Sequence, residues 1–266
     1  MVDRIQKLLV RRRDVALDWF IRSCGCSEPA TPSATYPEIE TLFRDEQSSW
    51  SISRDLARLL AHAVIGSQLS SVLEFGAGLS SLVLATSLSL VSSGRLTSVE
   101  QNPEWCREYW DRVMTLGSVD SRLVESKPRL TVGAAGFCYS FRSAARVVAS
   151  RGPYDIVLVD APQGFYGRDG VLQMLRQYLV SGALVVLDDA GRSGEQWALF
   201  RCLVTFRGYE LVFYDSDFGG RGCAVLRWNG DARIRPSLLA TSSSALQAAR
   251  YWRERRRLRA RTQEWM

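Results

Sequence analysis

Four short apolar runs that alternate with helix-like segments constrain the fold of this chain most strongly. The runs are SVLEF (71–75), RLTSVE (95–100), YDIVLVD (154–160) and GALVVLDD (182–189). Helical patterns lie between and after them at 79–92, 103–116, 169–180 and 193–206, and a weaker strand is expected within 122–132. Buried strands that alternate with helices of this length are typical of a parallel sheet covered by helices on both faces.

The last two strand-like runs differ from the others because they are close neighbours in sequence. YELVFYD (209–215) and GCAVLRW (222–228) are separated only by SDFGGR. This connection is too short to hold a crossover helix, so the two strands must be antiparallel. The sequence therefore predicts an α/β fold, a Rossmann-like three-layer sandwich whose mostly parallel sheet is closed by an antiparallel C-terminal hairpin.

Composition divides the 266 residues into three predicted parts. Residues 1–49 hold an N-terminal helix (4–24) and a linker rich in Pro, Ser and Thr (25–36), residues 50–230 form the Rossmann-like domain, and residues 231–266 form a basic helical tail. The tail carries nine Arg against one Asp and two Glu, a net charge of +6 that equals the net charge of the whole chain. Residues 1–230 therefore sum to zero.

Neither a membrane span nor a secretory signal is expected from the sequence. No run of about 18 apolar residues occurs, and the first 20 residues are charged throughout. The six cysteines are scattered and form no CxxC pair, which suits a reduced compartment better than a disulfide framework or a zinc site. We therefore expect a cytoplasmic protein.

The turn after the first strand is a candidate nucleotide site. Glycines in a strand–turn–helix unit let the backbone approach a ligand closely. The turn reads Gly76-Ala77-Gly78, and the third glycine position of the dinucleotide pattern is Ser81. Glu100 closes the next strand, where a carboxylate can accept both hydroxyls of a ribose. Alone, the turn is equally consistent with a tight structural turn, and Glu100 with a helix cap.

Together, the segments VLEFGAGLSS, LTSVEQNPEW, YDIVLVDAPQG and GALVVLDDAGR resemble class I S-adenosylmethionine-dependent methyltransferases over about residues 50–228. Bacterial small-molecule O-methyltransferases are the most similar, and the final antiparallel hairpin is also similar. The resemblance implies S-adenosylmethionine as cofactor. It implies cofactor contacts from residues at or after the ends of successive strands. These residues are Glu74, Gly76, Ala77, Gly78, Glu100, Gln101, Asn102, Glu125, Ser126 and Asp160. Ser53 is expected to close over the cofactor.

Three carboxylates are predicted at the strand ends on the acceptor side: Asp160, Asp188 and Asp189. Catechol-type O-methyltransferases place a divalent metal at similar positions, so the resemblance implies that these three residues hold Mg²⁺ or Mn²⁺. The alternative is that Arg168 and Arg192 pair with the aspartates. Without a metal, Asp160 or Asp188 would be the catalytic base. Arg168 would meet an acidic group, and Phe165 and Tyr166 would stack on a ring of the acceptor.

The resemblance implies methyl transfer to a hydroxyl of a small-molecule or sugar-like acceptor. Two alternatives remain open: an NAD-dependent oxidoreductase, and a non-catalytic Rossmann-like protein that binds an acidic partner through its tail. The basic tail could contact nucleic acid or an anionic surface. It could equally be a solvated helix, or one that docks through Leu246, Tyr251, Trp252 and Leu258. The single histidine, His62, is expected to lie away from the apolar face of its helix.

Overall fold

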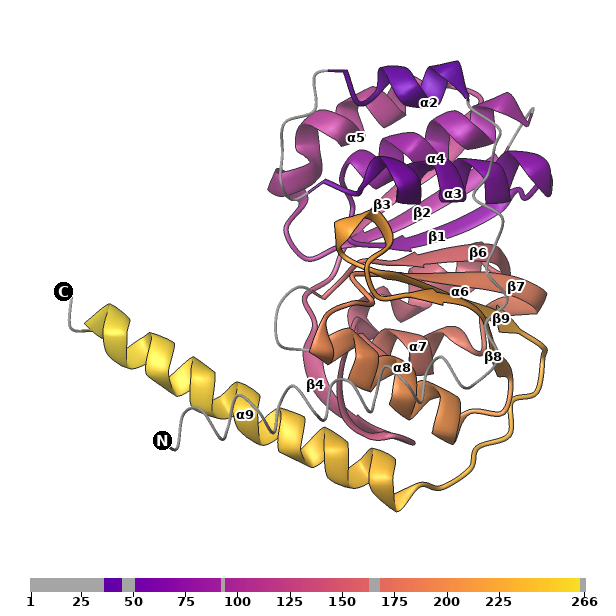
Figure 1. The fold of residues 1–266 in the computed structure, drawn as a ribbon. Helices are drawn as coiled ribbons and strands as arrows, with labels where there is room; N and C mark the ends of the chain where they lie inside the picture. Colours follow the sequence, from indigo (N-terminus) through magenta and orange to yellow (C-terminus); the bar gives the residue numbers. More distant parts are fainter. Residues whose placement is uncertain (1–35, 45–50, 92–93, 163–167, 264–266) are drawn as a thin grey trace.

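A seven-stranded sheet runs through the centre of the computed structural model, which describes residues 36–44, 51–91, 94–162 and 168–263 (Figure 1). The strand order is β3-β2-β1-β6-β7-β9-β8. The strands are β1 (Ser71–Phe75), β2 (Gly94–Glu100), β3 (Val119–Glu125), β6 (Tyr154–Val159), β7 (Leu179–Asp188), β8 (Tyr209–Asp215) and β9 (Cys223–Trp228). Only β9 is antiparallel to its neighbours, β7 and β8. The predicted fold class is confirmed.

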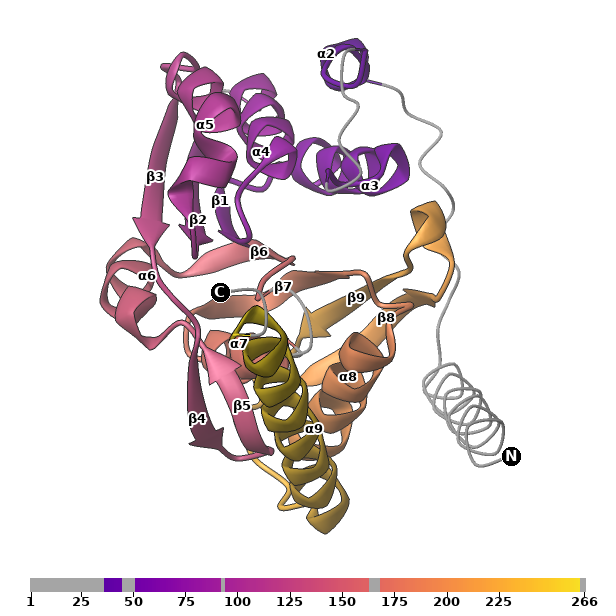
Figure 2. The same ribbon diagram turned by 90° about the vertical axis from the view of Figure 1, so that its left-hand side faces the viewer.

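Helices cover both faces of this sheet (Figures 1 and 2). One face carries α2 (Pro37–Thr41), α3 (Arg54–Gly66), α4 (Leu79–Leu90) and α5 (Arg107–Met114), and the other carries α6 (Ala145–Arg151), α7 (Asp169–Leu175) and α8 (Ser193–Thr205). Single 3₁₀ turns lie at Pro103–Cys106, Arg142–Ala144 and Phe218–Gly220. Alternate strand residues supply the two cores: Val72 packs on the first face and Leu73 on the second.

The segment predicted to hold one weak strand within 122–132 in fact contributes to two sheets. The main-sheet strand β3 ends at Glu125, and β4 (Arg129–Gly133) pairs antiparallel with β5 (Gly136–Ser140). Pro128 stands between β3 and β4, and a proline has no N–H to donate to a strand ladder. The chain therefore leaves the main sheet before Pro128 and turns back on itself at Ala134 and Ala135. Gly136, the first residue of β5, has a φ of +98°.

The tail forms the predicted helix, α9 (Leu238–Gln263), which extends outward from the domain in Figure 1. Its first turns lie against β5 and α8. Ala240 and Ser244 are buried there, and the Ser244 hydroxyl accepts a hydrogen bond of 3.0 Å from the Phe137 amide. Of the alternatives for the tail, docking through Leu246 and Trp252 is not what the structure has, because those side chains are 67% and 51% exposed.

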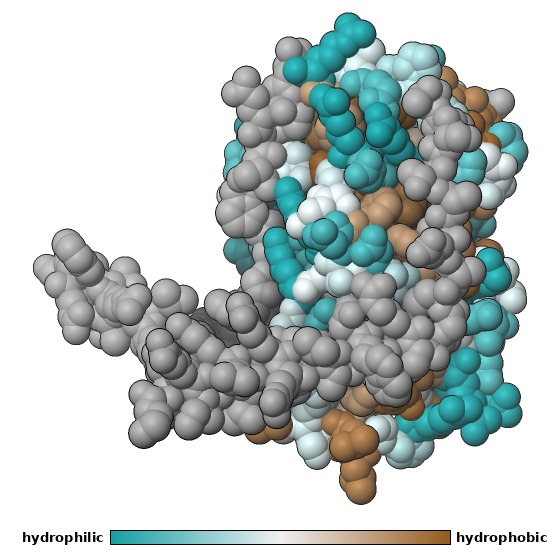
Figure 3. Space-filling view, in the orientation of Figure 1, coloured by the Kyte–Doolittle hydropathy of each residue, from teal (hydrophilic) through white to brown (hydrophobic). Residues whose placement is uncertain are grey.

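The side chains of Tyr251 and Leu258, also named for tail docking, lie outside the described residues. The hydrophobic protrusion at the lower end of the molecule in Figure 3 lies where α9 begins, and Leu238 and Leu239 at this end are exposed. The domain and the basic tail are thus in contact through the first turns of this helix.

The N-terminal helix predicted at 4–24 and nearly all of the linker lie outside the described residues, so the domain boundaries stay a prediction. The Ser53 hydroxyl caps α3 by accepting a hydrogen bond of 3.1 Å from the Leu56 amide. His62 is exposed on this helix, as expected. Among the described helices, none combines the length and the apolar character needed to cross a bilayer.

Candidate active site

The turn between β1 and α4 requires glycine at its first position. Gly76 has a φ of +95°, and a Cβ there would lie 3.1 Å from the backbone carbon of Asp160. The Gly76 amide donates a hydrogen bond of 2.9 Å to the Val99 carbonyl, which ties the turn to β2. Gly78 differs, because a Cβ added to it would meet nothing within 4 Å. Gly76 therefore serves the fold, while Gly78 keeps space free.

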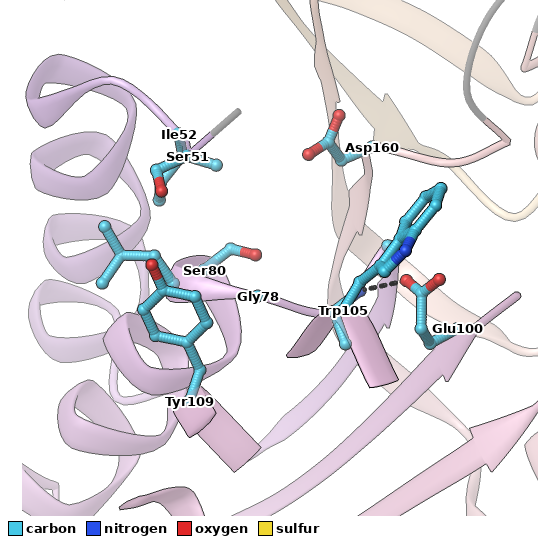
Figure 4. Close-up of a pocket in the computed structure, with 11 residues that line it drawn as sticks. Ser51, Ile52, Gly78, Ser80, Glu100, Trp105, Tyr109 and Asp160 are labelled. Carbon is cyan, nitrogen blue, oxygen red and sulfur yellow. Dashed lines mark hydrogen bonds between the residues drawn. The ribbon is translucent and has the colours of Figure 1, made fainter. Parts of the chain in front are cut away.

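That space is a pocket of about 480 Å³ at the carboxyl ends of β1, β2 and β6 (Figure 4). Its floor is the turn itself with the start of α4, and its walls come from three other parts of the chain. The lining residues are Ser51, Ile52, Gly76, Ala77, Gly78, Leu79, Ser80, Glu100, Trp105, Tyr109 and Asp160. Of the predicted cofactor residues, Gly76, Ala77, Gly78, Glu100 and Asp160 are therefore brought together.

The side chain of Glu100 is held in place by hydrogen bonds from backbone amides of two segments, the turn after β1 and the residues after β2. Its Oε2 accepts a hydrogen bond of 3.0 Å from the Ala77 amide, and its Oε1 accepts one of 2.8 Å from the Asn102 amide. Burial raises the pKa of its carboxyl above the usual value, and these backbone hydrogen bonds oppose the change. Because a carboxylate offers about four acceptor sites in all, Glu100 retains the capacity to accept a ligand hydroxyl.

Glu74 is buried beneath the turn and is not among the pocket-lining residues. Its Oε2 accepts hydrogen bonds of 2.5 Å from the Ser81 hydroxyl and 2.6 Å from the Ser98 hydroxyl. Its Oε1 has no hydrogen-bond partner within the described part of the chain. Burial raises the pKa of the Glu74 carboxyl to about 7. The structure thus places Glu74 as a support for the turn, and its predicted cofactor contact stays a prediction.

The remaining residues predicted to border the adenine lie beside the pocket without lining it. Asn102 contributes its amide to Glu100, and the Ser126 amide donates a hydrogen bond of 2.8 Å to the Glu100 carbonyl. Glu125 is the register partner of Glu100 on β3 and is exposed. Gln101 follows β2 and is partly exposed. Their predicted cofactor contacts also stay predictions.

Two aromatic residues and one segment of the pocket walls were not predicted from the sequence. Trp105, which is 61% exposed, lies on the same side as Glu100, while Tyr109, Ser51 and Ile52 face it across the pocket (Figure 4). The motif VEQNPEW held the signal for Trp105: Pro103 starts a 3₁₀ turn directly after the pocket strand, which brings Trp105 to the mouth. Ser51 and Ile52, which precede α3, carried no such signal.

The three carboxylates predicted to share a metal site do lie together. Asp160 follows β6, Asp188 ends β7 and Asp189 follows it, and one oxygen from each lies within 4.8 Å of the other two. Only Asp160 lines the pocket, with a side chain that is 24% exposed. Asp188 and Asp189 are buried. In type and spacing these donors suit an oxygen-ligated divalent ion.

A guanidinium already occupies the space among these carboxylates. Arg168, whose side chain is 1% exposed, directs its Nη2 to Asp160 Oδ1 at 2.9 Å and to Asp189 Oδ2 at 2.8 Å. Arg192, half-exposed, places its Nη1 2.7 Å from the same Asp189 oxygen. The alternative, in which both arginines pair with the aspartates, is the arrangement that the structure has. Glu195, also buried, lies 3.5 Å from Arg168 Nε.

Burial and charge act in opposite directions in this cluster. Burial raises the pKa of the Asp160 carboxyl well above its usual value and also raises that of Asp188, while the positive charge of Arg168 lowers both. Burial alone would lower the pKa of the Arg168 guanidinium, but the surrounding carboxylates more than reverse this effect. The pKa of Glu195 is raised, again mainly by burial. Phe165 and Tyr166 lie outside the described residues.

Solved methyltransferase structures share this architecture. An O-methyltransferase from Bacillus cereus in complex with SAH is 15% identical, with 80% of this chain and 97% of that chain covered at a TM-score of 0.53. The O-methyltransferase TomG from Streptomyces achromogenes, involved in tomaymycin synthesis and solved with SAM, is 17% identical, with 81% and 96% covered at a TM-score of 0.50.

No protein-family model matches the sequence, and no curated protein does. The structural similarity is nevertheless extensive, since it covers nearly the whole of each neighbour. At 15–17% sequence identity, this similarity shows the fold. The chain has the Rossmann-like fold of class I S-adenosylmethionine-dependent methyltransferases.

Proposed function

We propose that the protein is an S-adenosylmethionine-dependent methyltransferase that methylates a hydroxyl of a small-molecule or sugar-like acceptor. The observation that carries this proposal is the pocket above the Gly76–Gly78 turn, with the Glu100 carboxylate on its wall. Solved structures with the same fold that contain SAM or SAH support it. We propose a hydroxyl as the methyl acceptor because both of these proteins are O-methyltransferases.

The pocket residues suit the separate parts of the cofactor. Glu100 would accept hydrogen bonds from the ribose hydroxyls, since the backbone amides that donate to it leave acceptor capacity on its carboxylate. Trp105 would cover the adenine ring by stacking. The Gly76–Gly78 backbone would pass beneath the methionine part, where no side chain obstructs the approach. When bound, S-adenosylmethionine supplies an electrophilic methyl group.

Asp160 is the carboxylate best placed to act on the acceptor, because it alone of the three aspartates lines the pocket. It would take the proton of the acceptor hydroxyl as the oxygen attacks the methyl carbon. A carboxyl whose pKa lies above its usual value is better matched to this task at neutral pH. Asp188 and Arg168 were predicted to be catalytic. Since both are buried, we assign them to positioning Asp160.

Calorimetric titration with S-adenosylmethionine, S-adenosylhomocysteine and NAD tests the cofactor. We expect micromolar binding of the two adenosyl compounds and no binding of NAD. Gly78→Leu should abolish that binding without loss of stability, because the side chain would fill the pocket. Gly117→Leu is the matched control, since Gly117 also has open space around its Cβ but does not line the pocket. Binding of NAD alone would overturn the proposal in favour of an oxidoreductase.

Transfer of a radiolabelled methyl group to a panel of phenols, sugars and uronic acids tests the reaction. We expect a labelled ether product from at least one class, with a large loss of kcat in Asp160→Asn and little change in cofactor affinity. If the protein bound the adenosyl compounds but the Asp160→Asn variant kept full kcat, Asp160 would not be the base. Binding of neither cofactor would favour a non-catalytic protein.

A further inference from the structure

Arg168 holds the most enclosed charge at the carboxyl ends of β6 and β7. It precedes the first residue of α7, so the helix start fixes its backbone, and its carbonyl accepts hydrogen bonds from Val171 and Leu172. Its side chain runs back under the strand ends, where Nη1 donates to the carbonyls of Val159 and Asp188. One guanidinium thus joins the last residues of two neighbouring strands.

The same guanidinium joins the carboxylates that follow those strands. Its Nη2 lies 2.9 Å from Asp160 Oδ1 and 2.8 Å from Asp189 Oδ2, and its Nε lies 3.5 Å from Glu195 Oε1. Three acidic side chains from three places in the sequence therefore surround one cation. Such a set leaves the buried carboxylates with a partner that the chain itself supplies.

A divalent ion that bound Asp160 Oδ1 and Asp189 Oδ2 would compete with this guanidinium for the same oxygen atoms. Magnesium binds carboxylate oxygens at about 2.0–2.1 Å and needs near-octahedral space around it. An ion bound to Asp160 Oδ1 and Asp189 Oδ2 would lie beside Nη2, which contacts both oxygens. The two positive charges would repel each other in a buried site where water screens little. The acidic donors suit a metal ion, but their arrangement around Arg168 does not.

We propose that Arg168 is the permanent cation of this acidic cluster and takes the place of a divalent metal. The proposal deepens the proposed function and rests on it for one point only, which is that Arg168 holds Asp160 beside the acceptor. Metal binding can be measured without methyl transfer. An experiment can therefore contradict this proposal about Arg168 without contradicting the proposed function, and the reverse also holds.

Electron paramagnetic resonance of free Mn²⁺ tests the proposal on the full chain after treatment with EDTA and dialysis. We expect the signal of free Mn²⁺ to be the same with and without the wild-type protein throughout the micromolar range. Stoichiometric micromolar binding, lost in Asp189→Asn, would overturn the proposal. If methyl transfer is established, adding EDTA to the assay should leave its rate unchanged, and a rate abolished by EDTA and restored by Mn²⁺ would also overturn it.

The variant Arg168→Met keeps the carboxylates and removes the guanidinium. We expect it to gain a Mn²⁺ site, seen as lost free-ion signal and as a rise in thermal midpoint with added Mn²⁺ that the wild type does not show. Arg192→Met is the matched control: it removes a positive charge that contacts the same Asp189 oxygen but leaves Arg168 in place. We expect no Mn²⁺ site in it.

Two other outcomes of this comparison decide against the proposal. A folded Arg168→Met variant that still ignores Mn²⁺ would show that Arg168 does not keep an ion out, and so would an Arg192→Met variant that binds Mn²⁺ equally well. If Arg168→Met does not fold even with Mn²⁺ present, the wild-type titration decides alone.

Discussion

At the carboxyl ends of the strands, the buried acidic side chains near β1 and β2 have different partners from those near β6 and β7. On the β1 and β2 side, Glu74 is held by serine hydroxyls and Glu100 by backbone amides, and within the described residues neither has a cationic partner. On the β6 and β7 side, Asp160 and Asp189 share the guanidinium of Arg168. The first side is open to a pocket, while the second is largely closed.

This difference shows how the same residue type is put to different uses at neighbouring strand ends. Hydroxyls and amides orient a carboxylate without neutralising it, so its charge stays available to a ligand or, in a buried position such as that of Glu74, to a proton. A guanidinium that pairs with a carboxylate neutralises its charge, so the charge is no longer available to a ligand, and it fixes the position of the side chain. We infer that the open side serves ligand binding and that the closed side fixes Asp160 at the boundary between them.

Removing the cation from the closed side should have the largest effect on stability. We expect Arg168→Met to lose about 3–5 kcal/mol of unfolding free energy at pH 8, because it leaves buried carboxylates without their partner. Urea denaturation measures this loss. The loss should shrink at pH 5, where the carboxyl groups whose pKa burial raises take up protons and no longer need a cation.

Arg192→Met provides the comparison within the closed side. Its side chain is half-exposed, so water screens its pairing with Asp189, and we expect a loss below about 1 kcal/mol. Equal losses in the two variants would show that burial of Arg168 contributes nothing special and would remove the distinction between the two sides of the sheet edge.

The pH dependence of stability should reveal the buried, unpaired acid on the open side. Burial raises the pKa of Glu74 from 4.5 to about 7, so the folded protein holds this proton more tightly than the unfolded chain. Its contribution is therefore most favourable below pH 4.5 and is lost as the pH rises to about 7. The difference between the two pKa values corresponds to about 3 kcal/mol at most.

Glu74→Gln should remove this effect, since the amide oxygen can still accept from Ser81 and Ser98. In urea denaturation we expect the variant to match the wild type near pH 5 and to be more stable by up to about 3 kcal/mol at pH 8. Glu210→Gln, at an exposed position on β8, is the control and should show no such trend. A stability difference independent of pH would mean that Glu74 is ionised throughout.

Local patterns predicted the open side well, because its parts are contiguous in sequence. The strand, the glycine turn and the helix that follows lie within residues 71–90, and Glu100 ends the next strand of the same pattern. The closed side was harder to predict. The sequence indicated three strand-end aspartates and two nearby arginines, but whether a metal or Arg168 occupies the cluster depends on the path of the arginine side chain beneath β6 and β7.

The β4–β5 hairpin was missed for another reason. Both strands are short, β4 is mostly exposed, and β5 is mostly buried. Their apolar residues also follow directly on those of β3 unless Pro128 is recognised as a break. Trp105 was missed because a single aromatic residue after a proline has many structural explanations. Both cases depend on tertiary contacts that periodicity does not report.

Loss of the Glu100 charge should weaken the open side in ligand binding. We expect Glu100→Gln to bind S-adenosylmethionine about ten- to a hundredfold more weakly, the equivalent of about 1.5–3 kcal/mol for hydrogen bonds to a charged group. The amide nitrogen would also face one of the two backbone amides that now donate to Glu100. Calorimetry measures the affinity, and Glu104→Gln, an exposed neighbour, is the control. Unchanged affinity would place the ribose elsewhere.

Trp105 offers the smallest and most local test of the open side. A stacked aromatic contact contributes about 0.5–1.5 kcal/mol, so we expect Trp105→Ala to weaken S-adenosylmethionine binding up to about tenfold with unchanged stability. The affinity for methylthioadenosine, which keeps the adenine and lacks the amino-acid part, should fall by the same factor. Trp252→Ala removes another half-exposed tryptophan far from the pocket lining and should change neither affinity. If Trp105→Ala weakened the full cofactor but not methylthioadenosine, Trp105 would cover the methionine part instead, and the orientation of the cofactor in the pocket would have to be reversed.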